Sequence, residues 1–156
     1  MRLQSEGNRA FSLEELLPLI TEVTAAGGEF RLHPRGTSMR PMLREGKDSV
    51  ALVRPDAPRK REIYLYRRAS GQFVLHRLMR VEKDGTLTFC GDNQLLLEHG
   101  ITSDDLIARV EAYYRGQKRI SMRALRQRLY AALYCFWPYR WLRYLPRRVI
   151  QKLFHK

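Results

Sequence analysis

Three polar residues of this chain could together activate a nucleophile. Ser38 lies in a glycine-led loop, His76 lies in an apolar stretch 38 residues later, and Asp92 follows in a turn. A serine hydroxyl attacks a carbonyl efficiently only when a base takes its proton, and that base usually needs a third group to orient it. This set therefore indicates acyl transfer at an activated serine. Glu98 is a second candidate for the orienting carboxylate.

Each of these residues also has an ordinary structural explanation. A serine in a glycine-led loop is commonly a turn residue, and Gly91-Asp92-Asn93 is a common turn sequence. A histidine among Val74, Leu75 and Leu78 is commonly a packed, half-buried side chain. Residue types and spacing alone therefore favour structural roles over catalysis.

The pattern of apolar residues predicts the elements that would hold these side chains. Ser12 and Glu15 form a capping box, and apolar residues then recur at helical spacing until Gly27-Gly28. We therefore expect a helix within residues 1–28, kinked at Pro18.

Residues 29–115 have the pattern of a β-domain. Several stretches are rich in β-branched and aromatic residues and are separated by short turn signals, which indicates strands joined by hairpins. The expected strands are Ser49–Val53, Glu62–Arg68, Gln72–Glu82, Thr86–Cys90 and Leu106–Tyr114. The predicted fold class is mainly β within an α+β arrangement, built on a small, coiled, mostly antiparallel β-domain.

Residues 116–156 are expected to form a tail of basic, amphipathic helices. From about Ser121 apolar residues recur at helical spacing until Pro138, which ends the run. They are Met122, Leu125, Leu129, Ala132, Leu133 and Phe136. A second short helix is expected past Pro146. Its apolar residues are Val149, Ile150, Leu153 and Phe154.

The charge of the chain is concentrated in this tail. The formal net charge is +13, and residues 115–156 contain 12 Lys or Arg and no Asp or Glu. The remainder holds 17 basic and 16 acidic residues, so it is nearly neutral. Hydrophobic residues at 44% and charged residues at 29% are typical of a folded domain rather than a disordered one.

Cysteine usage and hydropathy bear on the cellular compartment. Cys90 and Cys135 show no CxxC or histidine-rich pattern, which favours two reduced thiols over a disulfide or a zinc site. Residues 1–10 lack the apolar core of a secretory signal. The longest uncharged stretch, 129–139, has 11 residues, whereas a membrane span needs about 20. We therefore expect a cytoplasmic protein, either free or peripheral on the inner face of the membrane.

Three interpretations of the tail stay open. In the first, its first helix packs on the β-domain and the arginines form a solvated face. In the second, residues 121–156 lie on an anionic membrane surface as an in-plane anchor, because Trp and Tyr favour the interface and basic residues attract anionic lipid. In the third, the tail binds nucleic acid, which is disfavoured because no nucleic-acid-binding motif is present.

Four segments resemble a known family in the order in which they occur. Residues 36–46 (GTSMRPMLREG) resemble the G-x-S-M-x-P-x-L-x-x-G box of the type I signal peptidase superfamily, which includes the self-cleaving SOS repressors. Residues 74–78 (VLHRL) resemble the H-R-V box of its archaeal and endoplasmic-reticulum branch, and residues 91–93 resemble its G-D-N box. Residues 106–110 resemble its closing strand. The similarity covers about residues 30–115.

The resemblance implies a serine endopeptidase that cleaves a peptide, such as a leader or signal-like substrate, without metal or cofactor. Ser38 would attack the peptide carbonyl, and His76 would take its proton in place of the lysine that other branches use. No lysine lies between Lys60 and Lys83, so no lysine near the motif competes for that place.

The family's remaining site residues correspond to positions around these two. Its acidic residues correspond to Asp92 and to Glu98, where the branch more often has Asp. The backbone N–H of Ser38 would hold the oxyanion. Neighbouring oxyanion or substrate contacts would come from Thr37, Met39 and Pro41. The substrate is expected to be an extended peptide that adds to a strand edge of the β-domain.

Two departures from the family pattern favour a rival from a different class. Gly36 stands where some relatives carry a hydroxyl two residues before the serine, and the N-terminal membrane anchor of true signal peptidases is not predicted. The rival is a non-catalytic peptide-binding or membrane-associated module that has retained the fold.

Overall fold

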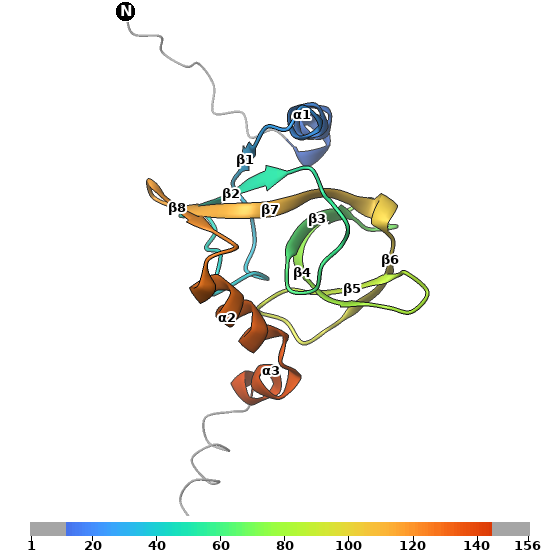
Figure 1. The fold of residues 1–156 in the computed structure, drawn as a ribbon, viewed down its shortest axis with the longest axis vertical. Helices are drawn as coiled ribbons and strands as arrows, with labels where there is room; N and C mark the ends of the chain where they lie inside the picture. Colours follow the sequence, from blue (N-terminus) through green and yellow to red (C-terminus); the bar gives the residue numbers. More distant parts are fainter. Residues whose placement is uncertain (1–11, 145–156) are drawn as a thin grey trace, which may run out of the picture.

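The β-rich middle of the chain forms one eight-stranded sheet in the computed structural model, which describes residues 12–144 (Figure 1). The spatial order is β1, β2, β7, β3, β4, β5 and β6, every neighbouring pair is antiparallel, and β8 pairs with β7 outside this path. The strands are β1 (Phe30–Leu32), β2 (Asp48–Val53), β3 (Ile63–Arg67), β4 (Phe73–Val81), β5 (Leu87–Cys90), β6 (Glu98–Ile101), β7 (Leu106–Arg115) and β8 (Lys118–Ser121).

Three α-helices flank this sheet within the described residues. Helix α1 (Leu13–Ala25) lies at one end of the molecule, and α2 (Leu125–Cys135) and α3 (Trp137–Tyr144) lie at the other (Figure 1). A single 3-10 turn, η1 (Ser103–Asp105), precedes β7. The small, mainly antiparallel α+β arrangement expected from the sequence is therefore confirmed.

The five expected strands are present as β2, β3, β4, β5 and β7, whereas β6 and β8 were not expected. The four residues of β6 include Glu98, His99 and Gly100, and β8 begins with Lys118, so neither strand shows the apolar alternation that marks a strand. Because β8 forms a hairpin with β7, the sheet extends to Ser121, beyond the predicted end of the β-domain at residue 115.

The sheet curls so that strand β3 is buried on both faces. Ile63 and Leu65 face a core cluster that also receives Ile20 from α1. Tyr64 and Tyr66 face a second cluster formed with side chains from β4, β5 and β6. Alternate residues of a strand point to opposite faces, so β3 contributes side chains to both clusters. Each such buried side chain contributes roughly 1.5–3 kcal/mol.

Helix α1 begins where the sequence places its cap. Ser12 Oγ accepts a hydrogen bond from Glu15 N at 3.2 Å, and Glu15 Oε2 accepts one from Ser12 N at 2.8 Å, so the capping box is confirmed. Gly27 follows the helix with φ at +81°, the left-handed conformation that glycine accepts readily. Pro18 lies inside α1, and a kink there stays a prediction.

Helix α2 packs on the sheet, but not by its leucines. Its buried residues are Gln127, Ala131 and Tyr134. The leucine face points outward, with Leu125 69% and Leu129 62% exposed. The packing of α2 on the β-domain is what the first interpretation of the tail expected, but the solvated face carries leucines as well as arginines. The second helix expected past Pro146 lies outside the described residues.

Candidate active site

The loop that carries Ser38 is anchored by the apolar residues of its own motif. Met39, Met42 and Leu43 are buried in the same core cluster that receives α1. Leu43 N donates to Met39 O at 3.0 Å, which closes a turn around these anchors. Ser38 is only half-buried at the start of this turn. A fixed backbone therefore presents the serine at the surface.

The loop between β5 and β6 fixes the backbone of Ser38. Asn93 N donates to Ser38 O at 2.7 Å. A Cβ atom on Gly91 would lie only 2.7 Å from the same carbonyl oxygen, which is the close backbone approach that glycine permits. Two motifs more than fifty residues apart in the sequence thus meet in space.

His76 lies on β4 and is almost completely buried, with 2% of its side chain exposed. Its Nδ1 lies 3.1 Å from Glu98 Oε1 on β6 and 3.3 Å from Tyr66 Oη on β3. Glu98 is itself held, because Tyr66 Oη donates to its Oε2 at 2.9 Å and Arg68 Nε donates to the same oxygen at 2.8 Å. The ring of His76 is therefore fixed by a carboxylate that two further side chains hold in place.

These contacts determine which nitrogen of His76 carries the proton. A carboxylate can only accept a hydrogen bond, and the Tyr66 hydroxyl already donates to Glu98, so both neighbours of Nδ1 act as acceptors toward the ring. The neutral imidazole then carries its hydrogen on Nδ1, and Nε2 has a free lone pair. This is the tautomer that a general base requires.

Burial and charge set the ionisation of this cluster. Burial lowers the pKa of His76 below its ordinary value, and the carboxylate of Glu98 offsets this only in part. Burial alone would raise the pKa of Glu98, but hydrogen bonds from Arg68 and Tyr66 outweigh it and hold that pKa below its usual range. At neutral pH the histidine is therefore neutral and the glutamate ionised.

The second nitrogen of His76 has no partner in the described part of the chain. Nε2 forms no hydrogen bond there, so the contacts of Nδ1 alone hold the ring.

An open pocket of about 120 Å³ lies beside Ser38. Its lining includes residues 34–36, Glu45 and the first three residues of β4, which precede His76. Strand β5 pairs with β4 only from Arg77 onward, so no strand of the described chain covers that edge of residues 73–76. An extended peptide can pair with such a free edge.

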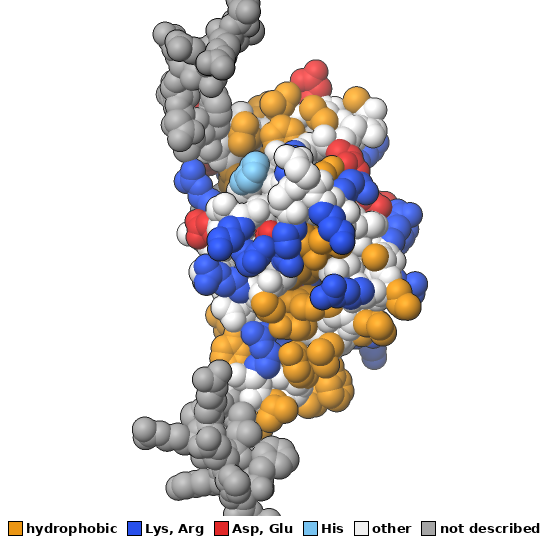
Figure 2. Space-filling model, turned by 90° about the vertical axis from the view of Figure 1, so that its left-hand side faces the viewer, with side chains coloured by type: hydrophobic (Ala, Val, Ile, Leu, Met, Phe, Trp, Pro, Cys, Tyr) orange, Lys and Arg blue, Asp and Glu red, His pale blue; other side chains and the backbone are white. Residues whose placement is uncertain are grey.

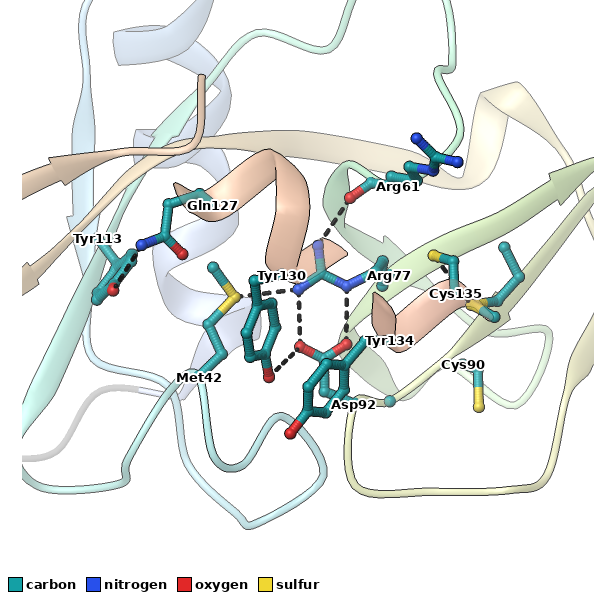
Figure 3. Close-up of polar contacts among 12 residues, drawn as sticks. Met42, Arg61, Arg77, Cys90, Asp92, Tyr113, Gln127, Tyr130, Tyr134 and Cys135 are labelled. Carbon is teal, nitrogen blue, oxygen red and sulfur yellow. Dashed lines mark hydrogen bonds and ion pairs between the residues drawn. The ribbon is translucent and has the colours of Figure 1, made fainter. Parts of the chain in front are cut away.

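Asp92 forms a buried ion pair with Arg77 and not with His76 (Figure 3). Arg77 Nε and Nη2 each lie 2.7 Å from one carboxylate oxygen, and both side chains have no exposed surface. Tyr130 of α2 donates to the same carboxylate at 3.2 Å. Neighbouring residues of a strand point to opposite faces, so a partner of Arg77 lies across the sheet from the ring of His76. Of the two predicted carboxylates, only Glu98 reaches the histidine.

A buried arginine attaches α3 to the loop between β5 and β6. Arg140 has no exposed surface. Its Nη1 donates to Gly91 O at 2.9 Å and to Gln94 O at 2.7 Å, and its Nη2 lies 3.8 Å from Asp92 Oδ1. Helix α3 is thus bonded directly to the loop that contacts the candidate nucleophile.

The remaining predicted contacts are not all at the pocket. Met39 lines it, whereas Pro41 lines a different pocket with Tyr113 and Tyr130. Thr37 is exposed and is not among the residues that line the pocket beside Ser38. The Ser38 N–H donates to no residue of the described chain, so it is available for an oxyanion.

Tyr66, Arg68 and Arg140 are site residues that sequence reasoning missed. A usable signal exists for Tyr66. The hairpin of β3 and β4 pairs Tyr64 with His76, and Tyr66, two residues along β3, points to the same face of the sheet as both of them. No comparable signal exists for Arg140, which lies far along the chain among other arginines.

In comparisons with known proteins, no family model, curated protein or solved structure matches this chain. None of the helices formed by residues 12–144 is both long enough and apolar enough to cross a bilayer. What the site can do chemically therefore has to follow from its own geometry.

Proposed function

We propose that this protein is a serine endopeptidase in which Ser38 is the nucleophile, His76 the general base and Glu98 the orienting carboxylate. The observation that carries the proposal is the approach of Glu98 Oε1 to within 3.1 Å of His76 Nδ1, which leaves Nε2 as a free proton acceptor. A histidine that only packs in a core does not need an ionised, doubly hydrogen-bonded carboxylate behind it.

The reaction would proceed through an acyl-enzyme. Ser38 Oγ attacks the peptide carbonyl carbon while His76 Nε2 takes the hydroxyl proton, and the Ser38 N–H donates to the oxyanion. The imidazolium, stabilised by Glu98, then protonates the leaving amine as the C–N bond breaks. Water then attacks the acyl ester while Nε2 takes its proton, and His76 returns that proton to Ser38 Oγ as the ester C–O bond breaks, which releases the second product and the free serine.

The substrate would be an extended peptide held against the free edge of residues 73–76, with the scissile bond beside Ser38. The motifs that resemble the type I signal peptidase superfamily support the same assignment and suggest a leader or signal-like peptide. As part of this proposal, the enzyme acts in the cytoplasm or at the inner face of the membrane, without metal or cofactor.

Covalent labelling tests the nucleophile. The full chain is treated with a fluorophosphonate probe, and the modified residue is identified by peptide mass mapping. We expect the probe on Ser38, no labelling in Ser38→Ala, and labelling at least about 10³-fold slower in His76→Gln. Ser70→Ala removes an exposed turn serine and serves as the matched control, with wild-type labelling. Equal labelling of Ser38→Ala and wild type would remove the proposal.

One observation favours the second candidate, a non-catalytic peptide-binding module. Ser38 Oγ and His76 Nε2 are not hydrogen-bonded to each other in the described structure. If this candidate is correct, extended peptides bind equally well to wild type and Ser38→Ala, no cleavage products form over days, and the fluorophosphonate probe leaves both proteins unmodified.

A further inference from the structure

The outward face of α2 is apolar along its whole length. Leu125, Leu129 and Leu133 follow one another at intervals of four residues and are 69%, 62% and 45% exposed. The opposite face, with Gln127 and Tyr134, is the one that packs on the sheet. A surface helix ordinarily buries its leucines, so this inverted orientation indicates a surface that something else covers.

Helix α3 extends this apolar surface with aromatic side chains. Phe136, Trp137 and Trp141 are 58%, 45% and 57% exposed, and Leu142 and Tyr144 are also exposed. Figure 2 shows hydrophobic side chains gathered at the height of α2 and α3, below a band of Lys and Arg. The orientation of α3 is fixed, because Arg140 of this helix has no exposed surface and is bonded to the loop between β5 and β6. The aromatic side chains are therefore held outward.

Cations border the leucine stripe on both sides. At 100° per residue, Arg126 lies beside one edge of the stripe and Arg128 beside the other. Both are exposed, and neither forms an ion pair within the described chain. Arg128 also lines an open pocket with Arg123 and the basic run 59–61, in which Glu62 is the one acidic lining residue.

We propose that the α2–α3 surface, formed by Leu125, Leu129, Leu133, Phe136, Trp137 and Trp141 with Arg126 and Arg128, lies in the plane of an anionic phospholipid bilayer. Its leucines would enter the boundary of the acyl chains, its tryptophans would lie at the headgroup level, and its arginines would contact lipid phosphates. This surface is independent of the peptidase site, so its test does not depend on whether Ser38 reacts.

The placement of charge favours lipid over two other occupants. Nucleic acid is held by cations along the centre of a groove, whereas here the centre is aliphatic and the cations lie at the margins. A second copy packed through the same surface would bring arginine margins toward each other, which is unfavourable. An anionic bilayer satisfies the apolar centre and the basic margins together.

Vesicle sedimentation with the full chain tests the surface. We expect the protein to sediment with vesicles of 30 mol% phosphatidylglycerol in phosphatidylcholine, and much less with pure phosphatidylcholine. Arg126→Gln/Arg128→Gln is expected to weaken anionic binding roughly 30-fold, since each basic residue at an anionic surface contributes about fivefold. Leu129→Gln/Leu133→Gln is expected to weaken it about tenfold or more.

Matched controls alter the same residue types elsewhere. Lys47→Gln/Lys83→Gln removes two exposed cations, and Leu19→Gln replaces an exposed helical leucine of α1 at the other end of the molecule. Both are expected to sediment like wild type, apart from a small effect of net charge.

Three outcomes would overturn the proposal. The first is unchanged sedimentation of Leu129→Gln/Leu133→Gln. The second is a dimer in analytical ultracentrifugation without lipid that the same variant dissociates, which would identify a second copy as the occupant. The third is tighter binding to a single-stranded oligonucleotide than to anionic vesicles, lost in Arg126→Gln/Arg128→Gln but kept in the leucine variant.

Discussion

Asp92 and Glu98 lie six residues apart, and either could have oriented His76, yet their surroundings differ. Asp92 has no exposed surface and pairs with Arg77, which is equally buried. Glu98 is 17% exposed, and its carboxylate contacts both the ring of His76 and the guanidinium of Arg68. The Arg68 side chain is 35% exposed.

Asp92 is a carboxylate that stabilises the fold, whereas Glu98 is a carboxylate that orients a group proposed to react. A fully buried ion pair cannot lose one member without leaving an uncompensated charge in the interior. A partly exposed ion pair can, because water reaches the charge of Arg68 that is left, whose side chain is 35% exposed. We therefore expect variants of Asp92 to lose stability first and variants of Glu98 to lose reactivity first.

The largest expected effect is the loss of reactivity in Glu98→Gln. An amide can hydrogen-bond to His76 in either tautomer and cannot stabilise the imidazolium, so Ser38 labelling by the fluorophosphonate probe should slow by about 10³–10⁴-fold. The unfolding free energy should change by no more than about 1 kcal/mol. Glu14→Gln, an exposed change on α1, is the control for reactivity. Wild-type labelling by Glu98→Gln would show that Glu98 does not support the reactivity of Ser38.

The next effect is the loss of stability in Asp92→Asn. This change leaves the charge of Arg77 buried without compensation, so we expect the unfolding free energy to fall by about 3–5 kcal/mol. Urea denaturation followed by circular dichroism measures it, with Glu98→Gln as the matched carboxylate variant. A stable Asp92→Asn protein that no longer labels at Ser38 would reverse the two roles.

A smaller effect is expected at Gly91, next to Asp92. In Gly91→Ala the new Cβ would lie 2.7 Å from Ser38 O and 2.7 Å from Gln94 Oε1, which predicts a loss of about 1–3 kcal/mol and slower labelling. Gly91→Ala/Gln94→Ala removes the flexible neighbour and leaves the backbone contact. If the double variant recovered wild-type stability and labelling, the clash in Gly91→Ala would be with the Gln94 side chain and not with the Ser38 carbonyl oxygen.

The smallest effect concerns the titration of His76, measured from its ring signals by NMR. The rate of Ser38 labelling should decrease only when the pH falls below about 6.5, the ordinary pKa of histidine. The reason is that burial lowers the pKa of His76. The unfolded chain binds a proton at His76 more readily than the folded protein does. The folded protein is therefore most stable, as far as His76 is concerned, above pH of about 6.5, and this stability is lost as the pH falls through the lower, folded-state pKa.

Glu98→Gln should lower the pKa of His76 further, because the carboxylate it removes is the group that favours the protonated ring. Glu14→Gln should leave the titration unchanged. A rise in the histidine pKa on losing Glu98 would show that the carboxylate does not act on the ring through its charge.

Much of the fold could be predicted because local chemistry determines it. Branched and aromatic residues between turns mark β2 to β5 and β7, and the Ser12 capping box marks the start of α1. The β-domain ends later than predicted, because β8 is a polar edge strand. Its pairing with β7 makes it a strand, and its composition does not predict one.

The candidate site could be predicted only as far as its motifs. Which carboxylate meets His76 depends on the face of β4 that each loop reaches, and the residues themselves do not reveal this. The orientation of α2 depends likewise on long-range contacts, such as the Tyr130 hydroxyl at Asp92, that outweigh the periodicity of its leucines.

The attachment of α3 by Arg140 has a spectroscopic consequence. Both tryptophans of the chain, Trp137 and Trp141, lie on this one helix, and the β-domain contains only tyrosine and phenylalanine among its aromatic side chains. Tryptophan emission therefore reports on α3 alone, while the NMR signals of the β-strand amides report on the domain. Coincident transitions would mean that α3 comes off only when the domain unfolds, and an earlier tryptophan transition would mean that the helix detaches first.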